Sequence, residues 1–204
     1  MHNSDAPDDE HAGLLGDRQA QQPLELQPFL PRLQKRVTLL VGLLVFQSCS
    51  SFILSSYEQL LTQHTVVVFF LTMLVGAGGN AGNQATVLVI RGLATGEITA
   101  KTHWRYVMSE ARMAIAIALL MVGAGIVRVK AFGYSTTDAV AIGTSLFCIV
   151  LSSVVIGAVL PMLLNYVGLD PAHAGATIQV VMDLAGVMIT CVVCSAMLAG
   201  EKPG

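Results

Sequence analysis

Gly76-Ala77-Gly78-Gly79-Asn80-Ala81-Gly82-Asn83-Gln84 lies in the middle of a long apolar stretch of this 204-residue chain. The flanking residues 66–71 and 85–90 are apolar and typical of a membrane span. Glycines and carboxamides are costly in hydrocarbon, because an unpaired amide or a loosened backbone finds no water there. Such a segment is tolerated where it faces protein or lines a polar cavity. We therefore expect it to loosen or break the helix and to line a pathway for something hydrophilic.

The composition indicates a membrane protein. Hydrophobic residues make up 54% of the chain and charged residues only 12%, against about 25% charged residues in a soluble domain. The net charge of −2 and the lack of a basic patch give no indication of a nucleic-acid partner. The cysteines all lie in apolar segments, where we interpret them as small buried hydrophobic side chains, including the Cys191-x-x-Cys194 pair. They are Cys49, Cys148, Cys191 and Cys194.

Five apolar segments are each long enough for the roughly 20 residues that cross a bilayer. The sequence thus predicts an all-α integral membrane protein with five transmembrane helices. The segments run from about Val37 to Ser56, Thr65 to Leu93, Val107 to Val129, Ala139 to Val167 and Ala174 to Leu198.

Before these segments, residues 1–34 form a polar tail that we expect to be disordered, with a short amphipathic approach near Leu24. Its early charges are acidic and the first apolar run starts late, so it does not have the pattern of a cleavable signal. Residues 35–200 are expected to form one transmembrane domain.

The distribution of Lys and Arg predicts the orientation, since cytoplasmic loops carry the excess of both. A cytoplasmic N-terminus places seven of these residues near the inner face and three near the outer face. The inner set is Arg32, Lys35, Arg36, Arg91, Lys101, Arg105 and Arg112, and the outer set is Arg128, Lys130 and Lys202.

Asp183 is an acidic residue near the middle of the fifth segment. A carboxylate there costs about 2.5–3.5 kcal/mol on insertion scales and is by default a functional candidate. Helical spacing places Gln179 one turn before it, and Gly186 and Thr190 one and two turns after it. The alternative interpretation is a protonated Asp183 that donates a hydrogen bond between helices.

Together, the two features provide a set of oxygen ligands. They are the Asp183 carboxylate, backbone carbonyls freed by the glycines, and the amides of Asn80, Asn83 and Gln84. Oxygen ligands suit hard cations, and the five histidines fall in the tail or in loops, so Mg²⁺ or Ca²⁺ fits better than zinc or copper. Mg²⁺ dehydrates reluctantly, so few charges and several amides suit an ion held through its water shell.

Several further motifs accompany Asp183. They are 78–84 (GGNAGNQ), 89–94 (VIRGLA), 96–98 (GEI), Leu160-Pro161 and 168–172 (GLDPA). In these motifs, and over roughly residues 32–200, the chain resembles the MgtE family of magnesium channels and the eukaryotic solute carriers that contain two MgtE-type halves.

The resemblance implies a symmetric homodimer in the lipid membrane, with its pore between the second and fifth spans. Asp183 matches the residue that holds hydrated Mg²⁺, the transported ion, and the pore-lining second span is matched by Asn80, Asn83 and the neighbouring glycines, Gly76 and Gly79 among them. Many relatives have hydroxyl residues just before the acid, where this chain has Gln179, Val180 and Met182, so Thr177 or Gln179 is expected to substitute for that contact. Bacterial relatives also carry cytoplasmic magnesium-sensing domains, where this chain has only its short tail.

The resemblance implies a transporter of Mg²⁺ or a related divalent cation, not an enzyme. Two other functions stay open from the sequence. A non-conducting regulatory or structural membrane subunit has the same composition. An intramembrane aspartic protease could pair two copies of Asp183, although no active-site pattern flanks this residue.

Overall fold

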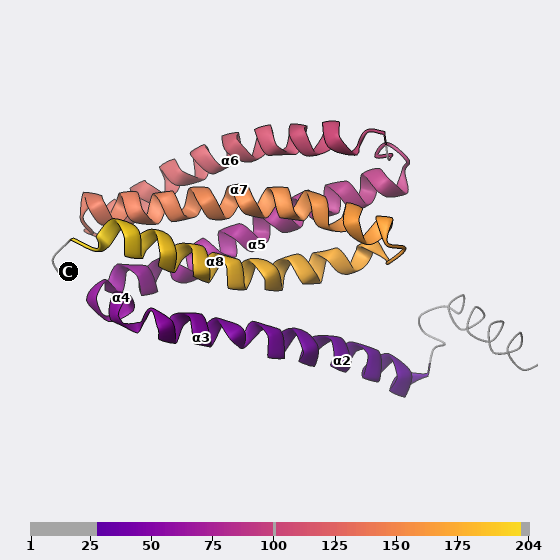
Figure 1. The fold of residues 1–204 in the computed structure, drawn as a ribbon, viewed down its shortest axis with the longest axis horizontal. Coiled ribbons are helices and arrows are strands. Elements are labelled where there is room, and N and C mark those ends of the chain that lie inside the picture. Colours follow the sequence, from indigo (N-terminus) through magenta and orange to yellow (C-terminus); the bar gives the residue numbers. More distant parts are fainter. Residues whose placement is uncertain (1–27, 100, 201–204) are drawn as a thin grey trace, which may run out of the picture. The chain divides into compact units, whose positions relative to one another are not determined.

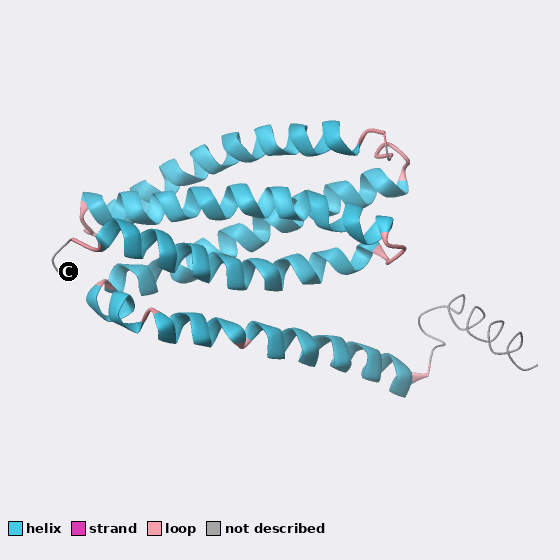
Figure 2. Cartoon of the chain, in the orientation of Figure 1, coloured by secondary structure: helices cyan, strands magenta, loops and turns pink. Residues whose placement is uncertain are grey.

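The structure, a computed structural model, describes residues 28–99 and 101–200. Over these residues every regular element is a helix, and Figures 1 and 2 show the helices joined by short turns. In chain order they are α2 (Phe29–Gln47), α3 (Cys49–Ser56), α4 (Glu58–Gln63), α5 (Thr65–Ala94), α6 (His103–Ala131), α7 (Thr136–Tyr166), the 3₁₀ helix η2 (Pro171–His173) and α8 (Ala174–Leu198).

Five segments of the described residues are long and apolar enough to cross a membrane, as predicted. They are Phe29–Ser56, which contains α2 and α3, and the four helices α5, α6, α7 and α8. The first begins at Phe29, earlier than the expected Val37. Pro31 does not prevent this early start, because it lies in the first turn of α2. Proline is tolerated there, since first-turn N–H groups have no intrahelical acceptor. Most of the expected tail, residues 1–27, lies outside the described residues.

The chain divides into two units, residues 1–44 and 45–204. The described part of the first unit belongs to α2, which has no buried residue. In the second unit, α7 packs against α5, α6 and α8, and α5 also packs against α8 (Figure 1). Fully buried apolar side chains fill the space between these helices, among them Leu74, Ile142, Ile149, Ile178 and Met182.

α5 runs without interruption from Thr65 to Ala94, so the expected loosening or break at Gly76–Gln84 is wrong. The reason is visible in the packing against α7. A Cβ added at Gly78 would overlap Ile149, and one added at Gly82 would overlap Ser153. These two glycines therefore let two helix backbones approach closely, and the helical backbone does not supply freed carbonyls as ligands.

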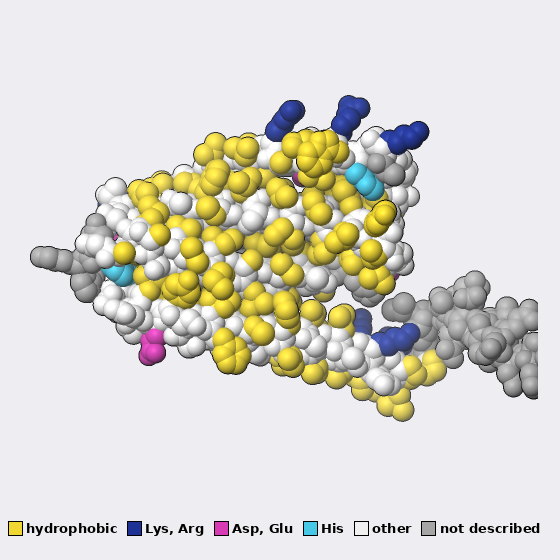
Figure 3. All heavy atoms as spheres, viewed as in Figure 1, with side chains coloured by type: hydrophobic (Ala, Val, Ile, Leu, Met, Phe, Trp, Pro, Cys, Tyr) yellow, Lys and Arg dark blue, Asp and Glu magenta, His cyan; other side chains and the backbone are white. Residues whose placement is uncertain are grey.

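The surface of the second unit suits a lipid environment. Figure 3 shows hydrophobic side chains over most of its visible face, with Lys and Arg side chains standing out along α6. Several large apolar side chains are strongly exposed, such as Leu120 at 77%. Apolar side chains exposed on long helices are what a bilayer requires of a spanning segment.

All four cysteines are free. Cys191 and Cys194 are buried, as expected, and the Sγ atom of Cys194 lies 3.6 Å from the Ser145 hydroxyl. Cys148 is half-buried and Cys49 is exposed, so the expectation that every cysteine is buried is wrong for these two. Of the two, Cys49 departs further from it. It lies at the start of α3, in a span that contributes little to the packed core.

Candidate cation site at Asp183

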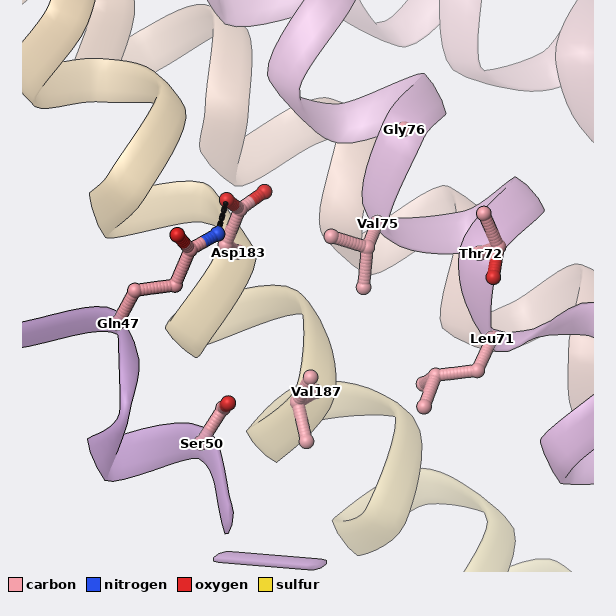
Figure 4. A pocket seen from close by; sticks show the side chains of 8 residues that line it. All are labelled: Gln47, Ser50, Leu71, Thr72, Val75, Gly76, Asp183 and Val187. Atoms are coloured by element: carbon pink, nitrogen blue, oxygen red, sulfur yellow. Dashed lines mark hydrogen bonds between the residues drawn. The ribbon is translucent and has the colours of Figure 1, made fainter. Parts of the chain in front are cut away.

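Asp183 lies near the middle of α8 and its side chain is half-buried. It opens onto a cavity of about 350 Å³ within the second unit. Figure 4 shows that α8 and α5 form two sides of this cavity and that the α2–α3 junction forms the third. The lining residues are Gln47, Ser50, Leu71, Thr72, Val75, Gly76, Asp183 and Val187.

Two carboxamides hold the two oxygens of Asp183. The Nε2 atom of Gln179 donates to Oδ1 at 3.0 Å, which agrees with the helical spacing that places Gln179 one turn earlier. The Nε2 atom of Gln47 donates to Oδ2 at 2.5 Å (Figure 4). Donors aimed at both oxygens suit an ionised carboxylate, which only accepts hydrogen bonds.

No basic side chain lines the described cavity beside Asp183. None of the eight lining residues is Lys, Arg or His. Within the described residues, His, Cys, Asp and Glu side chains form no group of three that could hold a metal ion directly. A single carboxylate with neutral amides cannot replace the water shell of a small divalent ion. It can bind that shell through hydrogen bonds.

The predicted pore residues of α5 divide between two faces of the helix. Gly76 lines the Asp183 cavity, and Gly79 faces Gln179 so closely that an added Cβ would overlap the Gln179 carboxamide. Asn83 lies near the start of α8, because a Cβ added at Gly175 would stand 3.4 Å from its Oδ1 atom. Positions 76, 79 and 83 are three and four residues apart, so they share the side of α5 that faces α8.

Asn80 lies on another side of α5. Together with Gln84 and Glu110 it lines a separate cavity of about 270 Å³ between α5, α6 and α7. Asn80 and Gln84 are four residues apart and so share this face. The structure therefore brings Gly76, Gly79 and Gln179 to Asp183 and places Asn80 and Gln84 elsewhere.

The remaining polar position of the predicted α8 stripe is satisfied within its own helix. Thr190 is buried, and its hydroxyl donates to the Gly186 carbonyl at 2.7 Å. Gly186 itself packs against Val75 of α5. Gly186 and Thr190 therefore contribute to helix packing on the C-terminal side of Asp183, whereas Gln179 donates a hydrogen bond to Asp183.

Gln47 is not among the site residues predicted from the sequence. It precedes Asp183 by 136 residues and belongs to a different span, so no local spacing connects the two. The available signal was the carboxamide itself, which follows the apolar run 37–46 at membrane depth.

Comparison with known proteins decides the family. The family model MgtE, described as a divalent cation transporter, matches residues 71–193, which include Asp183, Gln179 and the whole Gly76–Gln84 segment. The chain belongs to this family. The resemblance inferred from the motifs is thereby confirmed, and membership of a transporter family agrees with the prediction that the chain is not an enzyme.

Individual MgtE relatives give the same result. The chain is 32% identical to the magnesium transporter MgtE of Thermus thermophilus over 155 residues, which are 76% of this chain and 34% of that protein. It is 32% identical to that of Bacillus subtilis over 157 residues, which are 76% of this chain and 35% of that protein. It is 26% identical to that of Enterococcus faecalis over 156 residues, again 76% of this chain and 34% of that protein.

The chain thus spans about a third of the length of these MgtE relatives. Its described part holds five candidate membrane spans, and the family match covers most of them. The chain is therefore a multi-pass integral membrane protein.

Proposed function

We propose that this chain forms a membrane pathway for Mg²⁺, in which Asp183 holds the hydrated ion. The observation that carries the proposal is the Asp183 carboxylate at mid-span, half-buried and open to a cavity with no basic lining residue. A negative group at this depth is costly, and a passing cation offsets that cost. The similar proteins named as magnesium transporters support Mg²⁺ as the cation.

The size of the cavity supports a hydrated ion. Mg²⁺ prefers octahedral coordination and keeps several waters. Six waters at about 30 Å³ each need about 180 Å³, and the cavity measures about 350 Å³. The open space beside Asp183 is therefore large enough for a hydrated ion.

A second copy of the chain completes the pathway in this proposal. Asn83 is exposed on the side of α5 that faces α8, and Thr72 is exposed beside the Asp183 cavity. Exposed polar groups at membrane depth need a polar neighbour. A two-fold axis at this face brings two Asp183 carboxylates toward one ion and lines the path with both copies of α5 and α8.

The membrane potential supplies the driving force. Moving one charge through 100 mV is worth about 2.3 kcal/mol, so a divalent ion gains about twice that on entering an inside-negative compartment. Inward flux of Mg²⁺ then requires no coupled ion.

Uptake of Mg²⁺ into proteoliposomes that contain only this chain tests the proposal. We expect uptake by the wild type and a loss of at least about tenfold in Asp183→Asn, equivalent to about 1.4 kcal/mol. The matched control is Glu58→Gln, which removes an exposed carboxylate at the start of α4 and should leave uptake unchanged. Normal uptake by Asp183→Asn would exclude the site. No uptake by the wild type would favour the non-conducting subunit instead.

A further inference from the structure

We propose that the carboxamide of Gln47 is a displaceable cap on Asp183 that makes the site selective for a small divalent cation over monovalent ones. The inference rests on the proposed function, because it assigns a role at the same cation site. It concerns a residue outside the 71–193 family match.

Gln47 lies at the junction between α2 and α3. It is the last residue of α2, a single turn residue follows, and α3 begins at Cys49. Gln47 and Asp183 both belong to the unit 45–204. The carboxamide of Gln47 reaches Asp183 of α8 (Figure 4), and both residues line the cavity together with Ser50, one turn further along.

Gln47 also occupies a position that an ion needs. Water bound to a cation donates hydrogen bonds to a carboxylate, and an amide N–H donates in the same direction. With Gln47 on Oδ2 and Gln179 on Oδ1, both oxygens of Asp183 already have a donor. Each oxygen has a further lone pair, but Gln47 also lines the cavity, so the waters of a hydrated cation there compete with these amides for the carboxylate. The amide that is held less firmly is displaced first.

The surroundings of the two amides decide which one leaves. Gln179 is part-buried, belongs to the same helix as Asp183, and packs against Gly79. Gln47 is exposed and comes from another span. Its side chain can rotate away with little loss of packing, so Gln47 is the cap and Gln179 remains as the fixed partner.

Selectivity follows from the competition between donors. The charge of a bound divalent ion polarises its waters strongly, which makes them better donors than an amide and adds direct attraction to the carboxylate. The waters of a monovalent ion are less polarised and the attraction is halved. Divalent ions therefore displace Gln47 at lower concentrations than Na⁺ or K⁺ does.

The test compares Gln47→Ala and Gln47→Leu with the wild type in proteoliposomes, by measuring Mg²⁺ uptake against Mg²⁺ concentration and Na⁺ uptake in parallel. Hydrogen bonds to charged groups are among the stronger ones, so we expect the half-saturating Mg²⁺ concentration to fall about three- to tenfold and Na⁺ uptake to rise. A variant that is merely misfolded loses maximal rate and does not gain affinity. Gln59→Ala, which removes an exposed carboxamide of α4, is the control and should match the wild type.

The decisive comparison adds Gln47→Ala to the variant Asp183→Asn. There the charged partner of Gln47 is absent, so adding Gln47→Ala should change neither Mg²⁺ nor Na⁺ uptake. The cap hypothesis is wrong if Gln47→Ala leaves the half-saturating Mg²⁺ concentration unchanged or raises it. It is also wrong if Gln47→Ala has the same effect in the wild type and in Asp183→Asn. If Asp183→Asn abolishes uptake while Gln47→Ala behaves as the wild type, only the cap fails. Normal uptake by the single variant Asp183→Asn excludes the Asp183 site on which the proposed function and the cap both depend.

Discussion

Gly157 of α7 lies directly against the backbone of Gly82 of α5, and a Cβ at Gly157 would overlap the Gly82 carbonyl. The contact is part of the packing of α5 against α7. Backbone atoms cannot rotate away as a side chain can, so this contact sets how closely α5 and α7 approach. The position of α5 in turn fixes where its residues 71–76 line the Asp183 cavity.

Gly157→Ala should therefore destabilise the protein. Overpacking of this kind typically costs about 1–3 kcal/mol, because α5 and α7 must move apart to admit the methyl group. Thermal unfolding of the purified protein in detergent measures the effect. Gly123→Ala in α6 is the control, since a Cβ there meets nothing within 4 Å. It should be neutral or stabilising by up to about 1 kcal/mol, and equal losses in both variants would contradict the packing argument.

Thr86→Val should weaken the same helix pair by a smaller amount. Thr86 is fully buried, and its hydroxyl donates to the Gly157 carbonyl at 2.9 Å. Valine keeps the shape and removes the donor, which costs about 0.5–1.5 kcal/mol between membrane helices. The same unfolding measurement detects it. In the control, Thr62→Val, the lost hydroxyl bonds only within α4 and is exposed, so stability should not change.

The fold was predictable because hydropathy and length alone identify membrane spans. The segments expected for the second and fifth spans agree with α5 and α8 to within one residue at each end. The pairing of Gln179 with Asp183 was predictable for an equally local reason, because residues four apart share a helix face.

Other features depend on contacts that a single sequence does not contain. Glycine can loosen a helix or let another helix approach, and only the neighbours Ile149 and Ser153 show that α5 uses glycine for close packing. The approach of Gln47 to Asp183 depends on how two distant spans pack. The separation of Asn80 from the Asp183 cavity depends on where α6 and α7 lie around α5.

The orientation remains a prediction from charge, and cysteine labelling tests it. With a cytoplasmic N-terminus, the short helix α4, which begins with Glu58, faces outward, and the α5–α6 connection with Lys101 faces the cytoplasm. Both side chains are exposed. A membrane-impermeant maleimide applied to intact cells should label Glu58→Cys, but should label Lys101→Cys only after permeabilisation. The unsubstituted chain, with its native Cys49, gives the background, and the reverse pattern would place the N-terminus outside.

Gly79 and Gln179 should act on cation binding as one unit. A Cβ at Gly79 overlaps the end of the Gln179 side chain, which is flexible, so the substitution Gly79→Ala displaces that carboxamide and leaves the helices in place. Asp183 then loses the donor on Oδ1 that fixes its orientation. We expect Gly79→Ala and Gln179→Ala each to raise the half-saturating Mg²⁺ concentration about three- to tenfold, opposite in direction to Gln47→Ala.

The double variant separates this mechanism from independent damage at two sites. Once Gln179 is truncated, the methyl group of Ala at position 79 loses its closest contacts, because the three nearest atoms that it meets in the wild type belong to the Gln179 carboxamide. Gly79→Ala combined with Gln179→Ala should therefore be no worse than either alone, measured as Mg²⁺ uptake in proteoliposomes. Gly123→Ala again serves as the control for a new methyl group on a spanning helix. Additive losses, or unfolding of Gly79→Ala by itself, would mean that Gly79 is needed for helix packing and does not act through Gln179.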